Sequence, residues 1–358
     1  MIGKRLHRAR RAAGLSLRDL ADQVGVSHTT INKYEKDVGG AMPPSGQLIK
    51  IAKALGVRSD YFLRSTEVEL TGVEYRKRST TPKRLLRQIE ADVLDQAERW
   101  ITLLSLYPQS PVRPFVVPEE LPEVVTDLSQ LDQLADSVRG AWSLGLNPIP
   151  DMIDVLESMG VLVIMTAVDA QDKFDGLAAS VNGNPVIVVS QNWPGDRQRF
   201  TLAHELGHLL LEGRLGDGID EEKACNRFAG AFLLPSKAVV DLLGQNRSRL
   251  EMRELYMLKH EFGISMRGAL MRASQCAVIS DALKDRIFRQ FSKQGWQTNE
   301  PGDPYPPEVT YLYRQLVYRA LAEDYIGESK AAELLGMATS ALRMERKLGG
   351  VDAAAVNQ

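Results

Sequence analysis

The sequence predicts a mainly α protein with a small β-sheet, an α+β fold, in 358 residues. In most of the chain, apolar residues recur at the spacing of an amphipathic helix, between residues that cap helices. Apolar runs that suit strands are confined to residues 161–189. A composition that is 44% apolar and 25% charged is ordinary for a globular protein. We expect an N-terminal helix-turn-helix bundle, a central domain around an H-E-x-x-H helix, and a helical C-terminal region.

Charge is distributed unevenly along the chain. Residues 1–65 contain twelve Lys/Arg and five Asp/Glu, a net of +7, so the remainder is −9 given the net charge of −2. A basic N-terminal module joined to an acidic remainder indicates that residues 1–65 bind a polyanion. Two cysteines, no signal-peptide pattern and no membrane-length apolar run predict a cytoplasmic protein without a disulfide framework.

The first helices are bounded by local signals. Residues 2–13 form a basic helix that Gly14 ends, and Ser16 with Asp19 forms a capping box for a second helix. Gly25-Val26 makes a short turn, and Ser27 caps a third helix that runs from His28 to Lys36. Helix, glycine turn and helix at this spacing define a helix-turn-helix arrangement. A fourth helix over 45–55 and a short fifth over 59–63 complete the bundle.

The segment from Gly14 to Glu35, GLSLRDLADQVGVSHTTINKYE, resembles the Cro/C1 or XRE type of DNA-binding domain, and the resemblance covers residues 1–65. It implies that the third helix enters the major groove of double-stranded DNA, with five outward residues near bases and phosphates: His28, Thr29, Thr30, Asn32 and Lys33. A homodimer that reads paired half-sites is then expected. Leu17 stands where such domains often have glutamine, which removes one expected DNA contact. The alternative is a module used only for dimerisation or partner docking.

The middle of the chain predicts a connector and then a small sheet. The basic residues Arg76 to Arg78, Lys83 and Arg84 open a long helix to about Leu106; they form either a solvated face or extra phosphate contacts. An extended proline-rich linker over 108–122 precedes helices from Leu131 past Trp142 and on to Met159. A buried strand over 161–165 and a hairpin of 177–181 with 185–189, turning at Asn182-Gly183, follow.

The segment His204-Glu205-Leu206-Gly207-His208 lies in an amphipathic helix. Residues four apart share a helix face, so both imidazoles can bind one metal ion beside Glu205. A catalytic zinc needs a third ligand, and a second helix begins at Glu221-Glu222. Glu222 is suited to be that ligand, and Asn226, four residues later on the same helix face, can hydrogen-bond a ligating histidine without contacting the metal. Glu221 is the alternative ligand, about 100° away around that helix.

The stretch 197–235 resembles the ImmA/IrrE family of metallo-endopeptidases, which have a zincin-like fold. The family pattern R-x-R-F-T-x-A-H-E-x-G-H is matched by Arg197 to His208, and E-x-x-A-N-x-F-A-x-x-L-L-x-P by Glu222 to Pro235. The resemblance implies His204, His208 and Glu222 as Zn²⁺ ligands and Glu205 as the general base. The same ligands also suit iron or manganese, so zinc rests on the resemblance. The alternative is a metal-free pseudo-enzyme.

One departure from the family pattern is Cys225, which stands where the family usually has alanine. Its thiol is either an inhibitory or redox-sensitive ligand or a small buried hydrophobe, and the second reading is favoured.

Beyond Pro235 the chain is expected to be almost entirely helical. Residues 261–272 resemble the helix-turn-helix-like tail of the same peptidase family, 283–297 are basic and aromatic, and 299–307 form a proline-rich break. Residues 332–337 align loosely with 21–26; the alternatives are a second helix-turn-helix and a protein-contact module, and the lack of a basic recognition face favours the protein-contact module. The tail after Gly349 should be disordered. The resulting division is a DNA-binding domain over 1–65, a connector over 66–125, a peptidase domain over 126–290 and a C-terminal helical region over 291–358.

Two functions fit this organisation. The first is a DNA-binding regulatory zinc metalloprotease that cleaves a specific cytoplasmic protein, a transcriptional repressor, in a stress, DNA-damage or mobile-element response. The second is a DNA-binding regulator or antitoxin-like protein whose peptidase domain acts as a sensor.

Overall fold

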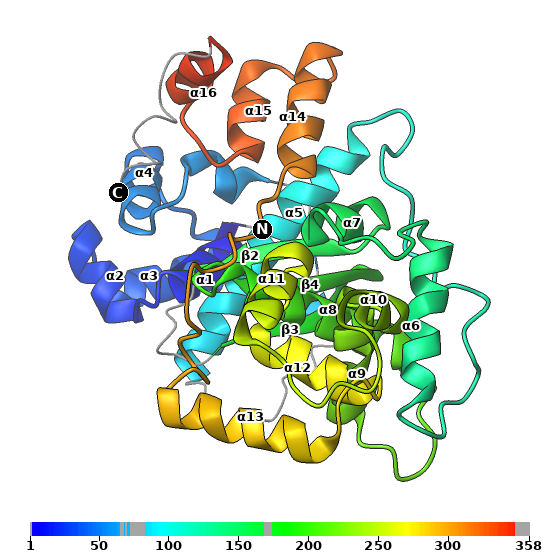
Figure 1. Cartoon of the computed structure of the whole chain (residues 1–358). Coiled ribbons are helices and arrows are strands. Elements are labelled where there is room, and N and C mark those ends of the chain that lie inside the picture. Colours follow the sequence, from blue (N-terminus) through cyan, green and yellow to red (C-terminus); the bar gives the residue numbers. More distant parts are fainter. Residues whose placement is uncertain (1, 65–67, 69, 72–82, 168–173, 348–358) are drawn as a thin grey trace. The chain divides into compact units, whose positions relative to one another are not determined.

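The structure is a computed structural model, which describes residues 2–64, 68, 70–71, 83–167 and 174–347 (Figure 1). Mainly helical with a small sheet, it confirms the predicted fold class. The chain forms two compact units: residues 1–70, 79–112 and 311–358 make unit 1, and residues 71–78 and 113–310 make unit 2. The four-part domain division remains a prediction. The basic residues Arg76 to Arg78 and the tail after Gly349 lie outside the described residues, as do the side chains of Lys83 and Arg84.

Unit 1 begins with the helix-turn-helix bundle: α1 (Ile2–Ala12), α2 (Leu17–Val24), α3 (His28–Glu35), α4 (Ser45–Ala54) and two 3₁₀ turns, η1 (Val38–Gly40) and η2 (Ser59–Leu63). The predicted caps are confirmed, since Ser16 and Asp19 form a capping box and Ser27 accepts from the Thr30 amide. Gly25 ends α2 with φ of 72°, a left-handed conformation that glycine adopts without strain. The short fifth element is a 3₁₀ turn rather than an α-helix.

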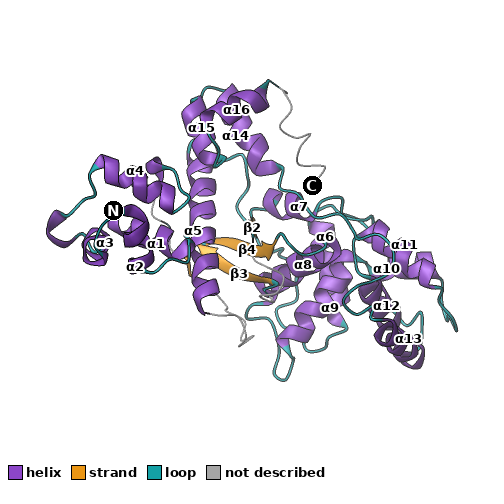
Figure 2. Cartoon of the chain, turned by 90° about the vertical axis from the view of Figure 1, so that its left-hand side faces the viewer, coloured by secondary structure: helices purple, strands orange, loops and turns teal. Residues whose placement is uncertain are grey.

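The bundle has its own apolar core and also packs on two more distant segments of unit 1. Leu6, Leu20, Ile31, Ile51 and Phe62 are fully buried together. The long helix α5 (Lys83–Ser105) runs beside α1 (Figure 2). Helices α14 (Leu312–Ala322), α15 (Glu328–Leu334) and α16 (Thr339–Arg346) complete the unit, with α14 and α15 against α5. Residues from both ends of the chain therefore share one unit.

Unit 2 is built on a sheet with the order β3-β4-β2. Strand β2 (Leu162–Thr166) pairs in parallel with β4 (Asn184–Ser190), and β3 (Gly176–Val181) pairs antiparallel with β4 through a turn at Asn182-Gly183. The hairpin prediction is confirmed, and the first strand is displaced by one residue. A two-residue strand, β1 (Leu70–Thr71), falls at the boundary between the units.

Helices cover this sheet and supply most of the core of unit 2. Helix α8 (Gly195–Leu211) packs on β3 and β4, α9 (Glu221–Leu233) packs on α8, and α6 (Gln130–Ala141) packs on α9. The remaining helices are α7 (Met152–Ser158), α10 (Ser236–Leu243), α11 (Met252–Phe262), α12 (Met266–Gln275) and α13 (Asp281–Gln294). Among the described residues no helix is both long enough and apolar enough to cross a membrane.

The predicted linker over 108–122 is extended, but it is anchored on unit 2 from Arg113 onward. Leu121 is buried, the Arg113 Nε donates to the Ser158 carbonyl, and the Val125 amide donates to the Arg214 carbonyl. The proline-rich break over 299–307 also belongs to unit 2, where it leads into Glu308. Neither segment is a free spacer.

Candidate metal centre and nucleic-acid interface

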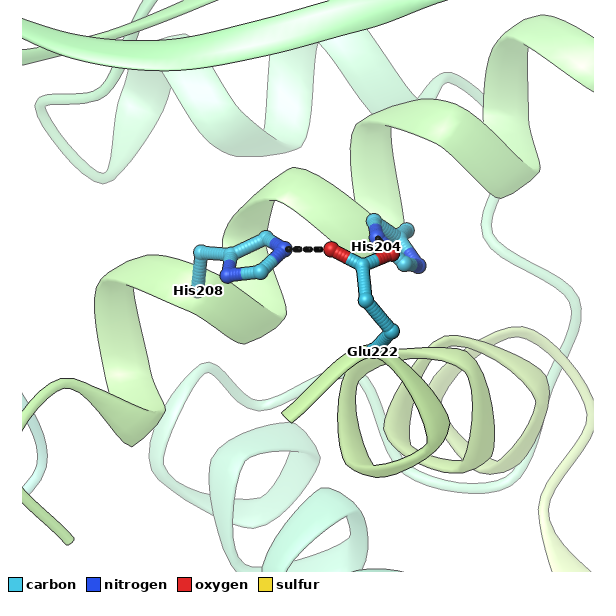
Figure 3. A group of neighbouring side chains, drawn as sticks. All are labelled: His204, His208 and Glu222. Carbon is cyan, nitrogen blue, oxygen red and sulfur yellow. Dashed lines mark ion pairs between the residues drawn. The ribbon is translucent and has the colours of Figure 1, made fainter. Parts of the chain in front are cut away.

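Three side chains from α8 and α9 converge in unit 2. His204 and His208 lie one turn apart on α8, and Glu222 reaches toward both from the first turn of α9 (Figure 3). One ligand atom from each of the three lies within 4.8 Å of the others. The two histidines are buried, while the Glu222 side chain is 51% exposed. The predicted ligand set is thus brought together, although its role as a ligand set remains a proposal.

The separations between these atoms fit a shared metal ion. The His204 Nε2 is 3.8 Å from Glu222 Oε2, and the His208 Nε2 is 3.7 Å from Glu222 Oε1. Two tetrahedral ligands with bonds near 2 Å to one zinc ion stand about 3.3 Å apart, so small side-chain movements suffice. Two imidazoles and one carboxylate also match the donor set of a catalytic zinc site with an open position.

The other nitrogen of each imidazole contacts a residue of α9. The His204 Nδ1 lies 2.9 Å from Asn226 Oδ1, and the His208 Nδ1 lies 2.8 Å from Glu221 Oε1. Such contacts orient an imidazole and leave its Nε2 directed at the metal position. Asn226 occupies the place that the sequence predicted. Glu221, which the sequence left open as an alternative ligand, contacts His208 from the side away from Glu222.

Helix α9 is held in place by ion pairs behind the site. Asp132 of α6 accepts from the Arg227 Nε at 2.6 Å and from the Arg272 Nη2 of α12 at 2.7 Å. Burial alone would raise the pKa of Asp132, but the two guanidinium groups and Ser236 outweigh burial and lower it. Asp132 is therefore ionised at neutral pH and fixes the helix that carries Glu222.

Glu205 is buried beside the two histidines and faces the start of β3. A Cβ atom at Gly176 would lie 3.7 Å from the Glu205 Cγ and 2.5 Å from the Thr201 Cγ2. Only a residue without a side chain lets this strand approach α8 so closely. The side chain of the proposed general base therefore lies close to the first residue of β3.

Cys225 is fully buried in the core of unit 2 and is not part of the three-residue cluster. Its Cβ would lie 3.4 Å from a Cβ at Gly207, so the residue packs between α9 and α8. The arrangement favours the hydrophobic reading of Cys225.

The N-terminal end of α8 is supported by residues that the sequence analysis did not single out. Arg199 is fully buried, and its Nη1 donates to Glu308 Oε1 at 2.5 Å. Glu308 also accepts from the Met152 amide at the start of α7. The Lys259 Nζ of α11 forms an ion pair with Glu300 Oε2 at 3.0 Å. Arg199 is therefore a structural residue, and the neighbouring Arg197 donates from its Nε to Asp175.

The residues predicted to contact DNA lie on α3 in unit 1. His28, Thr29 and Lys33 are exposed, whereas Thr30 and Asn32 are half-buried. The hydroxyl groups of Thr29 and Thr30 lie 2.7 Å and 2.8 Å from the Ser27 hydroxyl. The exposed three are well placed to meet a nucleic acid, and all five remain proposed DNA contacts.

Two arginines of α1 are buried instead of solvated. Arg10 pairs with Glu35 at the end of α3, with Nε to Oε1 at 2.5 Å, and Arg5 pairs with Glu98 of α5 at 2.7 Å. Burial raises the pKa of Glu35, but hydrogen bonds from Arg10 and His7 outweigh burial and hold the pKa below its ordinary value. These residues position the bundle instead of facing DNA.

Comparison with known proteins identifies both parts of the chain. Residues 156–274 match the family described as the IrrE N-terminal-like domain, and residues 6–62 match the helix-turn-helix family. The chain therefore carries an XRE-type helix-turn-helix domain together with a peptidase-type domain of the ImmA/IrrE kind.

Individual relatives match one part of the chain at a time. The radiation response metalloprotease IrrE of Deinococcus deserti is 41% identical over 71 residues, which is 16% of this chain and 25% of that protein. The prophage-derived HTH-type regulator YonR of Bacillus subtilis is 35% identical over 69 residues, 19% of this chain and 62% of the relative. An HTH-type transcriptional regulator of Rickettsia conorii is 39% identical over 66 residues, 18% and 51% respectively. The chain thus spans about half the length of these regulators and a quarter of the metalloprotease.

Proposed function

We propose that this protein is a DNA-binding regulatory zinc endopeptidase that cleaves a specific cytoplasmic protein, a transcriptional repressor. The observation that carries the proposal is the convergence of His204, His208 and Glu222 beside Glu205, in a chain that also has a helix-turn-helix domain. The similarity to a radiation response metalloprotease supports the same reading. Binding through α3 would concentrate the peptidase at the genes whose repressor it removes, and a homodimer would read two half-sites.

In this proposal each residue has one role. His204, His208 and Glu222 would hold Zn²⁺, and the bound ion would supply Lewis-acid chemistry to a peptide carbonyl and to water. Glu205 takes the proton from the attacking water and delivers it to the leaving amine. Asn226 and Glu221 orient the two imidazoles through their Nδ1 atoms.

The decisive variant is Glu205→Gln, which keeps the shape of the side chain and all three proposed ligands. We expect purified wild-type protein and the variant to contain equal zinc, measured by elemental analysis. Cleavage of co-expressed candidate repressors should fall at least about a hundredfold in the variant, since general-base catalysis contributes roughly that factor or more. Glu212→Gln, at an exposed residue just after α8, is the matched control and should cleave normally.

Absence of zinc in the wild type, or cleavage that survives in Glu205→Gln, would contradict the proposed enzyme. If specific DNA binding persists while no candidate is cleaved by the wild type, the peptidase domain is a sensor and the chain is a transcriptional regulator.

A further inference from the structure

A cavity of about 320 Å³ lies between α1 and α5 in unit 1. Its α1 wall is made by Lys4, His7, Arg8 and Arg11. Residues spaced by three and four share one helix face, so these four side chains form a basic stripe toward the cavity. Glu90 and Leu94 lie on the α5 wall.

Among the described residues that line this cavity, three Lys/Arg and one His lie opposite one Glu. Residues 4–11 contain five Lys/Arg, one His and no acidic residue. The two buried carboxylates that face α1 are each shared: Glu98 accepts from both Arg5 and Arg8, and Glu35 contacts both Arg10 and His7. Glu90 is the carboxylate that lines the cavity itself. A concave surface with this excess of cations attracts an anion.

The dimensions and the donors favour a phosphate-bearing ligand. A volume of about 320 Å³ is in the range of small-molecule sites, and guanidinium groups bind phosphate through paired hydrogen bonds. Leu94 adds an apolar surface for the uncharged part of such a molecule. A lone surface arginine would not offer the second and third cations that line this concave surface.

The cavity lies toward the C-terminal end of α3, away from His28 and Thr29 but close to Lys33 among the predicted DNA contacts. A Cβ at Gly3 of α1 would lie 2.5 Å from the carbonyl oxygens of Tyr34 and Glu35, so the first turn of α1 abuts the C-terminal end of α3. His28 and Thr29 lie at the N-terminal end, about 10 Å away along the helix axis. The cavity is therefore separate from His28 and Thr29, and binding to duplex DNA has to be measured beside binding of a small anion.

We propose that the cavity between α1 and α5 binds a small anion that carries two or more phosphate groups. The ligand would contact His7, whose Nδ1 lies 2.8 Å from the Glu35 carboxylate at the last residue of α3. The site is therefore one side chain away from the recognition helix.

The test uses the full chain and inorganic pyrophosphate as the probe, with binding measured by titration calorimetry at low ionic strength. The double variant Lys4→Gln/Arg11→Gln should raise the Kd for pyrophosphate about tenfold or more, because two charge-assisted contacts are lost. Glu90→Gln should lower the Kd about threefold, because the opposing carboxylate is removed. Lys50→Gln/Lys53→Gln, two exposed charges of α4, is the matched control and should leave the Kd within about twofold.

The proposal would be overturned if the wild-type chain did not bind pyrophosphate. It would also be overturned if Lys4→Gln/Arg11→Gln and Lys50→Gln/Lys53→Gln lost the same amount of affinity for pyrophosphate. Circular dichroism melting shows whether the double variant Lys4→Gln/Arg11→Gln folds. If it does not fold, Leu94→Glu takes its place, because it adds a negative charge to the cavity without removing a cation. This variant must then abolish pyrophosphate binding. If Lys4→Gln/Arg11→Gln weakens binding to duplex DNA while pyrophosphate never binds, the cavity belongs to the DNA surface and the proposal is wrong.

Discussion

The two histidines of the candidate metal centre are oriented by neighbours that differ in charge. Asn226 offers His204 a neutral amide oxygen, whereas Glu221 offers His208 a carboxylate. A carboxylate partner strengthens the imidazole as a ligand and fixes its tautomer with Nδ1 protonated. The sequence could place Glu221 and Glu222 on adjacent faces of one helix. Which of them meets the metal depends on how α9 crosses α8, and local pattern does not specify that.

Replacing Glu221 with alanine should therefore weaken zinc binding without removing a proposed ligand. We expect the Kd for Zn²⁺ to rise about tenfold, the lower end of the usual effect of losing such a partner. Competition with a chromophoric chelator measures this, and Glu212→Ala serves as the control. An unchanged Kd in Glu221→Ala would mean that the contact with His208 contributes nothing to the site.

Glu157 on α7 is a buried carboxyl group outside the metal centre. Burial, followed by repulsion from Asp154 and Asp151, raises the pKa of Glu157 well above its ordinary value. Between pH 4.5 and the folded-state pKa, folded protein holds a proton that the unfolded chain has released. The free energy of unfolding must then fall as pH rises through that window.

Glu157→Gln mimics the protonated side chain and should remove this pH dependence. We expect the variant to be more stable than the wild type at pH 8 by at least about 1 kcal/mol and close to it at pH 5. Urea unfolding at the two pH values measures the difference, with the exposed Glu119→Gln as the comparison. If the free energies of unfolding of the variant and the wild type differed by the same amount at both pH values, Glu157 would be ionised in the folded protein.

At the scale of single elements, helix ends and turns could be predicted from the sequence because short local patterns of residues define them. The capping box of Ser16 with Asp19, the left-handed Gly25 and the Asn182-Gly183 turn are each defined within four residues, and all are present. The parallel pairing of β2 with β4 was not predictable in this way. It joins residues such as Leu162 and Val186, which are 24 positions apart, and neither strand carries a local signal for its partner. The sequence therefore predicted which segments form helices and strands. It did not predict how closely β3 approaches α8.

That approach makes Gly176 a sensitive position. A Cβ there would lie 2.5 Å from the Thr201 Cγ2 and 2.7 Å from the Val188 carbonyl oxygen, and the latter is backbone that cannot simply rotate away. Gly176→Ala should therefore lower the free energy of unfolding by about 2 kcal/mol, as overpacked sites do. Gly140→Ala in α6 meets nothing within 4 Å and should be neutral or stabilising by up to about 1 kcal/mol. Urea denaturation of both variants checks the contrast; equal effects would argue against a close β3–α8 contact.

On the scale of the whole molecule, each unit is closed by contacts between residues far apart in the chain. In unit 2, Glu308 reaches Arg199 across 109 residues. In unit 1, Arg64 joins Asp95 of α5 at 2.8 Å and Glu333 of α15 at 3.1 Å, although Glu333 is 269 residues away from Arg64. Charged residues in helical patterns are usually solvated, and the sequence analysis assigned 291–358 to a C-terminal helical region of its own, with 332–337 as a protein-contact module. Only the fold shows that these helices complete the unit that contains the helix-turn-helix bundle.

Removing the Glu333 carboxylate should consequently loosen residues remote from it in sequence. In Glu333→Ala the Arg64 guanidinium, 12% exposed, loses one of its two carboxylates, at an expected cost of about 1–2 kcal/mol. Hydrogen-exchange mass spectrometry should then show exchange about tenfold faster in α5 and η2, with α8 and α9 unchanged. Glu323→Ala, an exposed residue just after α14, is the control. Faster exchange confined to α14–α16 would mean that these helices rest on unit 1 without stabilising it, and that the DNA-binding bundle folds independently of them.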